Sequence, residues 1–184
     1  MSAEFWSNYY SQGGDFHPVR EPEVELLAQH VGPGAGRSAL DVGCGTGALA
    51  AVLHELGFIV AGVDFAAAAI ATARERYPDR DGLDFRVLDV DRGGLSLLSP
   101  GGFHLVTCRL SLAFTDLVPV IAAARHLLTP GGSLHVTTPL AERQTAEKRS
   151  IGLRAAELDL LRGFGWSRTT EYPLDDLLCL LLTI

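Results

Sequence analysis

The chain has 184 residues, of which 47% are hydrophobic, so it is long enough to form one folded domain with a sizeable core. Its formal net charge of −7 and the absence of a basic run disfavour a nucleic-acid partner, because nucleic-acid binders take most of their affinity from a basic face. The sequence lacks a signal-peptide pattern and a membrane-length apolar run, and its three cysteines are widely spaced, so we expect a cytoplasmic protein without membrane association, disulfides or a metal site.

Strand and helix signals alternate along the chain, which predicts an α/β domain with a mostly parallel sheet. Aromatic residues near the start indicate a first helix, and Pro22 opens a second helix that extends to His30. Further helices are expected at residues 46–56, 66–77, 116–128 and 150–162. Seven strands are expected, at residues 39–42, 58–63, 83–88, 103–108, 133–138, 166–172 and 177–183. Residues 91–102 form a glycine-rich connection with at most a short helix, and residues 130–132 are expected to turn the chain into the fifth strand.

The first expected strand runs directly into a glycine-rich loop, residues 43–47, and a helix follows. Glycine permits tight turns and close approach of the backbone to a ligand, and a helix N-terminus offers unpaired N–H groups. Asp64 lies 21 positions after Gly43, at the end of the next strand, where a carboxylate is placed to bind a ribose diol. This spacing predicts a site for a nucleoside cofactor.

Two residues around the loop indicate which cofactor it is. A dinucleotide fingerprint needs G-x-G-x-x-G or a close variant, whereas Ala48 occupies the sixth place here. Asp41 stands just before the glycines, where its charge would repel a pyrophosphate. A cofactor with a cationic centre and an ammonium group suits that carboxylate better than a nicotinamide dinucleotide does.

The stretch Leu40-Asp41-Val42-Gly43-Cys44-Gly45-Thr46-Gly47 resembles the cofactor motif of class I S-adenosylmethionine-dependent methyltransferases. Gly62-Val63-Asp64-Phe65 resembles the second motif of that family, and the likeness continues in order through residues 88–90, 103–108 and 128–134. The resemblance implies a doubly wound, Rossmann-like domain with helices on both faces of a seven-stranded sheet that ends in an antiparallel pair. It also implies direct transfer of a methyl group from S-adenosyl-L-methionine to a small-molecule acceptor.

We expect residues 1–184 to form a single methyltransferase domain with three parts. Residues 1–34 would be an N-terminal helical cap or lid, residues 35–140 the cofactor-binding core, and residues 141–184 a C-terminal helix followed by the strand pair.

The resemblance also implies which residues contact the cofactor. They are Asp41, Gly43, Cys44, Gly45, Asp64, Phe65, Asp89, Val90 and Arg109. Some of these residues have alternative interpretations that the sequence leaves open. Asp64 could instead cap the following helix, Asp89 could be a solvated loop residue, and Asp41, expected to be half-buried, could only brace the glycine loop. Cys44 is expected to be a small filler of the loop and not a nucleophile.

The acceptor is expected beyond the end of the fourth strand. Candidates for contact with it are Tyr10, His17, Ser111 and Phe114. Arg109 at the same place could meet an anionic acceptor or could be solvated. The aromatic residues of the first helix could form a lid over the pocket or pack the terminus onto the domain. His104 stands where the family often has aspartate, and it is expected to be structural, because the start of a strand lies far from the ligands.

The sequence leaves three hypotheses about function open. The first is an S-adenosylmethionine-dependent methyltransferase with a small-molecule acceptor. The second is a protein that keeps the cofactor pocket without catalysis, as a sensor or partner subunit, and the third is an NAD-dependent oxidoreductase. The sequence names no general base, no acceptor atom and no oligomeric state.

Overall fold

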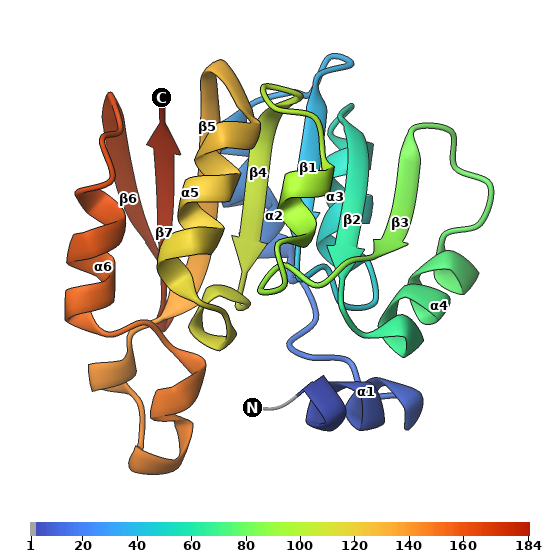
Figure 1. Cartoon of the computed structure of the whole chain (residues 1–184), viewed down its shortest axis with the longest axis horizontal. Coiled ribbons are helices and arrows are strands. Elements are labelled where there is room, and N and C mark those ends of the chain that lie inside the picture. The colour runs from blue at the N-terminus through green and yellow to red at the C-terminus, as the bar shows by residue number, and fades with distance from the viewer. Residues whose placement is uncertain (1–2) are drawn as a thin grey trace.

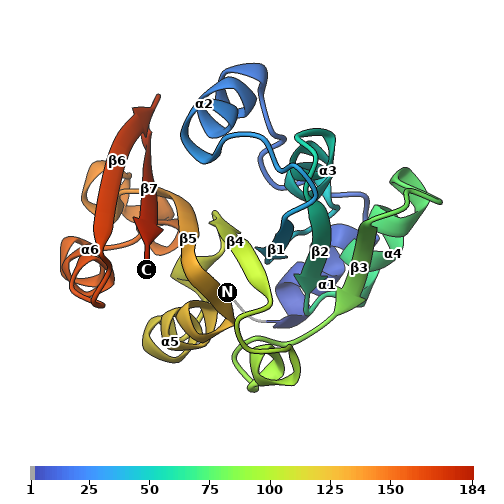
Figure 2. The same ribbon diagram turned by 90° about the horizontal axis from the view of Figure 1, so that it is seen from above.

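The computed structural model describes residues 3–184 and contains one seven-stranded sheet with helices on both faces (Figure 1, Figure 2). The strands are β1 (Ser38–Val42), β2 (Ile59–Asp64), β3 (Leu83–Val87), β4 (Phe103–Arg109), β5 (Leu128–Pro139), β6 (Arg168–Leu174) and β7 (Leu177–Thr183). The α-helices are α1 (Ala3–Ser11), α2 (Glu21–Val31), α3 (Ala48–Glu55), α4 (Ala67–Arg76), α5 (Leu117–Leu127) and α6 (Ala155–Arg162). Short 3₁₀ helices are η1 (Gly94–Leu97), η2 (Leu112–Phe114), η3 (Ala141–Arg143) and η4 (Ala146–Ile151).

The strand order is β3-β2-β1-β4-β5-β7-β6. Strands β1 to β5 are parallel, while β7 pairs antiparallel with both β5 and β6. The chain builds outward from β1 to β3 and then returns to place β4 on the other side of β1. Ligands of open α/β sheets bind at the carboxyl ends of the strands where the order reverses in this way. The topology therefore places the candidate site beyond the ends of β1 and β4.

The sheet separates two hydrophobic layers. Helices α5 and α6 pack on one face over buried residues such as Leu40 and Val106, and α2, α3 and α4 pack on the other over residues such as Ala39 and Leu105. Neighbouring residues of one strand therefore contribute to opposite layers, as the pleat requires. The expected α/β class, the seven strands, the antiparallel end and the helices on both faces are confirmed.

Two expectations about the second half of the chain were wrong. Strand β5 begins at Leu128, which pairs with Phe103, so the Pro-Gly-Gly segment lies within the strand at a shift of register and not in a separate turn. The helix expected over residues 150–162 begins only at Ala155. Leu153 instead donates its N–H to Pro139 O, which keeps residues 152–153 extended along the end of β5.

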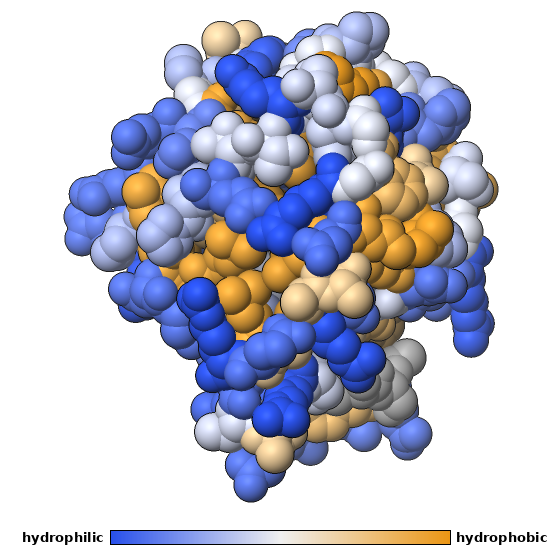
Figure 3. Space-filling model, turned by 90° about the vertical axis from the view of Figure 1, so that its left-hand side faces the viewer, coloured by the Kyte–Doolittle hydropathy of each residue, from blue (hydrophilic) through white to orange (hydrophobic). Residues whose placement is uncertain are grey.

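Apolar areas lie between hydrophilic side chains on the surface beside β6 and α6 (Figure 3).

Among the described residues, no helix is long and apolar enough to cross a membrane.

Candidate active site

A cavity lies at the carboxyl edge of the sheet and encloses about 960 Å³, its open mouth included. Its walls come from the loop between β1 and α3, the segments after β2, β3 and β4, and the N-terminal residues up to Val19. The cavity thus lies where ligands of open α/β sheets bind, at the carboxyl ends of β1 and β4.

Every residue expected from the sequence to contact cofactor or acceptor lines this cavity. The cofactor set is Asp41, Gly43, Cys44, Gly45, Asp64, Phe65, Asp89, Val90 and Arg109, and the acceptor set is Tyr10, His17, Ser111 and Phe114. The fold thus brings together side chains that are up to about 100 positions apart, although their roles as ligand contacts remain predictions.

The glycine loop has a backbone that other residues would not tolerate. Gly43, Gly45 and Gly47 have φ angles of +71°, +53° and +86°, in the left-handed region. A Cβ at Gly43 would lie 2.6 Å from Cβ of Ser111, and one at Gly45 would lie 2.9 Å from the hydroxyl oxygen of Tyr10. The loop therefore needs glycine both for its conformation and for the close approach of its neighbours.

Asp64 braces this loop from the end of β2. Its Oδ2 accepts a hydrogen bond from the N–H of Gly45 at 3.0 Å, and its Oδ1 accepts one from the N–H of Ala66 at 2.8 Å, immediately before α4. The side chain is buried, which raises the pKa of its carboxyl group. Asp64 therefore braces the turn before α4 and does not cap that helix, whose N-cap residue is Ala66. The same carboxylate also lines the cavity.

Asp41 is fully buried and not half-buried as expected, because β1 is a central strand with neighbours on both sides. Its Oδ1 accepts a hydrogen bond from the Thr107 hydroxyl at 2.7 Å, at the paired position of β4. Its Oδ2 has no partner among the described residues. Burial raises the pKa of Asp41 to about 6, although the Thr107 hydroxyl and the Arg109 guanidinium oppose the shift.

Arg109 is not solvated but paired with Glu23. Its Nε and Nη2 donate to the two carboxylate oxygens of Glu23 at 2.6 and 2.9 Å, and Nη1 donates to His17 O at 2.7 Å. The two side chains are only 11% and 6% exposed. The solvated alternative was therefore wrong, because α2 supplies a buried counter-charge. Contact with an anionic acceptor stays untested.

The N-terminal aromatics extend one wall of the cavity. Trp6 is 6% exposed and packs edge-on against Phe16 and Phe114, with ring centroids 4.9 and 5.2 Å away. Tyr10 also lines the cavity, where burial and the nearby Asp64 raise its pKa. Phe5 points outward and is 47% exposed. Helix α1 lies across the carboxyl edge of the sheet, as a lid would (Figure 1).

Three residues that sequence reasoning missed attach the segment after α1 to the glycine loop. The Thr46 hydroxyl donates to Asp15 at 2.9 Å, and Arg76 donates to both Asp15 and Thr46 at 2.7 and 2.8 Å. Their separations of 30 to 61 positions leave no local pattern that could have revealed them.

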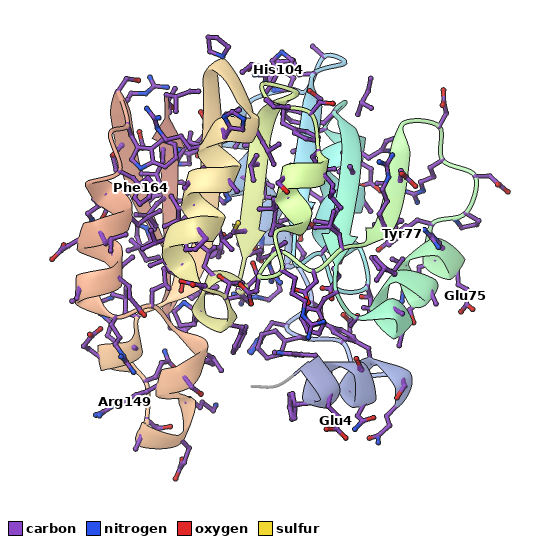
Figure 4. The ribbon with its side chains drawn as sticks, in the orientation of Figure 1. Glu4, Glu75, Tyr77, His104, Arg149 and Phe164 are labelled. Atoms are coloured by element: carbon purple, nitrogen blue, oxygen red, sulfur yellow. The ribbon has the colours of Figure 1, made fainter. Side chains whose placement is uncertain are left out.

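Two other residues clarify the limits of the site. His104 lies at the edge of the sheet opposite α1, where its Nδ1 is 3.0 Å from the Ser38 hydroxyl, which confirms its structural position (Figure 4). Asp89 accepts the backbone N–H groups of Asp91 and Arg92, so it orders its own loop in addition to lining the cavity.

A family model described as a methyltransferase domain matches residues 40–134, which is more than half of the chain. The chain belongs to the S-adenosylmethionine-dependent methyltransferases. It is 32% identical over 128 residues to a ubiquinone biosynthesis O-methyltransferase of Albidiferax ferrireducens, covering 68% of this chain and 51% of that one. A protein of the same name from Nitrosococcus oceani is 33% identical over 139 residues, covering 71% and 56%. The chain thus spans about half the length of these curated methyltransferases.

Solved methyltransferase structures share the fold. A SAM-dependent methyltransferase from Aquifex aeolicus superimposes with a TM-score of 0.75 at 14% identity, covering 100% of this chain and 99% of that one. Phosphoethanolamine N-methyltransferase 2 of Haemonchus contortus, in complex with S-adenosyl-L-methionine, gives 0.73 at 19% identity, covering 94% and 44%. Within residues 3–184, no group of three potential metal ligands is gathered that could hold a metal ion.

The buried Asp41 predicts a pH-dependent effect of the substitution Asp41→Asn. Because the folded pKa of about 6 exceeds the unfolded value of 3.8, ionised Asp41 destabilises the fold, increasingly from pH 4 to 6 and fully above pH 6. The difference between these two pKa values corresponds to a destabilisation of roughly 3 kcal/mol at most. We expect Asp41→Asn to raise the free energy of unfolding by about 1–3 kcal/mol at pH 8 and to lose this gain as the pH falls to 4.

Urea unfolding of both proteins at pH 4, 6 and 8 measures this effect. Asp84→Asn, at an exposed position of β3, is the matched control and should differ from the wild type equally at each pH. A difference between Asp41→Asn and the wild type that does not change with pH would contradict the prediction.

Proposed function

We propose that this chain transfers a methyl group from S-adenosyl-L-methionine to a small-molecule acceptor. The observation that carries the proposal is the single cavity in which the glycine loop, Asp41, Asp64 and Asp89 meet residues from β4 and α1. One wall has the features of a nucleoside-cofactor site, and the opposite wall has room and side chains for a second molecule.

The residues present fit the cofactor. The unpartnered Oδ2 of Asp41 is a buried acceptor whose cost would be relieved by a donor such as the ammonium group of the cofactor's methionine part. Asp64 would take the ribose hydroxyls, and Asp89 with Val90 would border the adenine. Bound S-adenosyl-L-methionine supplies a methyl group on a sulfonium, which is already a good leaving group.

The contribution of the protein to catalysis is positioning. Glycines remove side chains from one wall, so the two reactants can approach each other closely. Trp6 and Tyr10 cover the cavity and limit the access of water. Holding two reactants in line supplies a large part of a rate enhancement, so the absence of an assigned general base does not argue against catalysis. An acceptor that must lose a proton before it attacks would need one.

We also propose a cellular compartment and a class of acceptor. Cys44, Cys108 and Cys179 are free, buried thiols, which supports a reducing cytoplasm. The relatives named for ubiquinone biosynthesis support a small-molecule acceptor, but the chain spans only about half their length, so we extend to it only that class. A pocket that binds cofactor without catalysis is the alternative. A nicotinamide dinucleotide is disfavoured because Ala48 occupies the sixth place of the glycine motif and Asp41 would repel the pyrophosphate.

Calorimetry provides the test of cofactor identity. We expect S-adenosylhomocysteine and S-adenosyl-L-methionine to bind the full chain at one site, and NAD not to bind at comparable concentrations. Binding of NAD without binding of the adenosyl cofactors would overturn the proposal. Methyl transfer to a small-molecule panel, followed with a labelled methyl group, then separates an enzyme from a catalytically silent binding protein.

Asp64→Ala should weaken the binding of S-adenosylhomocysteine by about 2–4 kcal/mol, because the ribose hydroxyls and the Gly45 N–H lose a charged acceptor. This corresponds to roughly 30- to 1,000-fold in the dissociation constant. Asp84→Ala, on the exposed edge strand, is the control and should leave the constant unchanged. If Asp64→Ala binds as the wild type does, Asp64 only braces the glycine loop and the turn before α4.

The position of α1 predicts a lid that closes on ligand. Removal of residues 1–14 should leave the melting temperature nearly unchanged but shorten the residence time of S-adenosylhomocysteine, because Trp6 and Tyr10 are lost from the cavity wall. Trp6 should report closure through its fluorescence, with Trp166→Phe used to remove the other tryptophan. Unfolding of the truncated chain, together with a Trp6 signal that ignores the ligand, would show that these aromatics belong to the core.

A further inference from the structure

We infer that the acceptor is an uncharged, ring-containing molecule, and that Glu23 determines this specificity by neutralising Arg109. This inference rests on the proposed methyltransferase function and specifies its acceptor. It follows from three features of the described cavity, namely its cations, its carboxylates and its aromatic rings.

Arg109 is the only arginine or lysine among the described residues that line the cavity. Its guanidinium makes a two-point ion pair with Glu23 and also donates to the carbonyl oxygens of His17 and Pro18. Four of its five N–H donors can thus be assigned to protein acceptors. A phosphate or carboxylate that made a two-point contact with Arg109 would have to displace Glu23 and leave that carboxylate buried without a partner, which is unfavourable.

The remaining charges of the cavity are negative. Its lining carboxylates are Asp15, Asp41, Asp64, Asp89 and Asp91. Arg76 pairs with Asp15 and Arg92 with Asp89, so the carboxylates without an ion pair among the described residues are Asp41, Asp64 and Asp91. Such a lining suits a cofactor with a cationic sulfonium and opposes the approach of an anionic acceptor. It also opposes a charged amine as nucleophile, because a protonated amine has no lone pair and nearby carboxylates stabilise its protonated form. An uncharged acceptor avoids both costs.

Aromatic rings from outside the glycine loop also line the cavity. Trp6 from α1, Phe16 from the following segment and Phe114 from η2 pack around one another, with centroid distances of 4.9, 5.2 and 6.4 Å. Tyr10 stacks on Trp6 at 5.9 Å. Rings arranged in this way favour a flat apolar molecule in offset or edge-on contact. The hydroxyl groups of Tyr10 and Ser111 offer polar contacts beside them.

Glu23 reaches this site from α2, where it is 6% exposed on a helix whose other acidic residues are exposed. Its carboxylate is not needed to start the helix, because the exposed Glu21 already supplies an acidic residue in the first turn. Its position against Arg109 therefore accounts for its burial. Replacing Glu23 should release the guanidinium toward the cavity.

The test uses three phenols that share one ring and differ in charge. These are 4-methylphenol (neutral), 4-hydroxybenzoate (anionic) and tyramine (cationic). Each is titrated by ligand-observed NMR against the full chain saturated with S-adenosylhomocysteine, so that the adenosyl half of the cavity is blocked. We expect 4-methylphenol to bind at least about tenfold more tightly than 4-hydroxybenzoate, because the lining carboxylates repel the anion.

Glu23→Gln tests the role of the ion pair. It should strengthen the binding of 4-hydroxybenzoate and leave that of 4-methylphenol within about twofold. Glu21→Gln removes the same charge from an exposed position of the same helix and should change neither. If Glu23→Gln does not fold, the preference of the wild-type chain among the three phenols still decides the question of charge.

Other outcomes overturn the inference. Tightest binding of 4-hydroxybenzoate indicates an anionic acceptor, and tightest binding of tyramine a cationic one. Binding of S-adenosylhomocysteine with no binding of any phenol rejects the ring-shaped acceptor and leaves the proposed function intact. Failure to bind S-adenosylhomocysteine at all rejects the proposed function itself.

Discussion

The close packing around the glycine loop is the constraint on which the rest of the site depends. A Cβ at Gly43, Gly45 or Gly47 would lie within 3 Å of Ser111, Tyr10 or Phe85, respectively. These three side chains come from the segment after β4, from α1 and from β3. The loop backbone is therefore the common surface against which these three side chains pack, and only glycine allows them to approach so closely.

Asp41 is a carboxylate that the fold buries in the middle of the sheet. Asp41 lies one residue before the end of β1, with β2 on one side and β4 on the other, so water cannot solvate it. Thr107 satisfies one oxygen and leaves the other unpaired among the described residues. A buried carboxylate with an unpaired oxygen destabilises the protein when no ligand is bound. Residues that lower stability in this way are typical of functional sites.

The sequence was sufficient for features that depend on neighbouring residues. Strand and helix periodicity predicted the α/β sheet, and the spacing of Gly43 and Asp64 located one side of the cavity. Features that depend on distant residues were missed or misjudged. The ion pair of Arg109 was missed because its partner, Glu23, is 86 positions away. The full burial of Asp41 was missed because it depends on packing against β4. The late start of α6 reflects the pairing of Leu153 with Pro139, which helical periodicity does not show.

The region that resembles other methyltransferases contains the residues that we propose to bind the cofactor. The family match begins at residue 40 and contains the glycine loop, Asp64 and Asp89. Trp6, Phe16 and Glu23, which we propose to border the acceptor or control its choice, all lie before it. This early segment is attached to the core by Asp15, which accepts from Thr46 and Arg76, and by His17 O, which accepts from Arg109. Arg109, Ser111 and Phe114 lie within the matched region, so our proposed acceptor side combines residues from inside and outside it. The resemblance to other methyltransferases therefore covers the cofactor half, while the choice of acceptor also depends on contacts from the segment before residue 40.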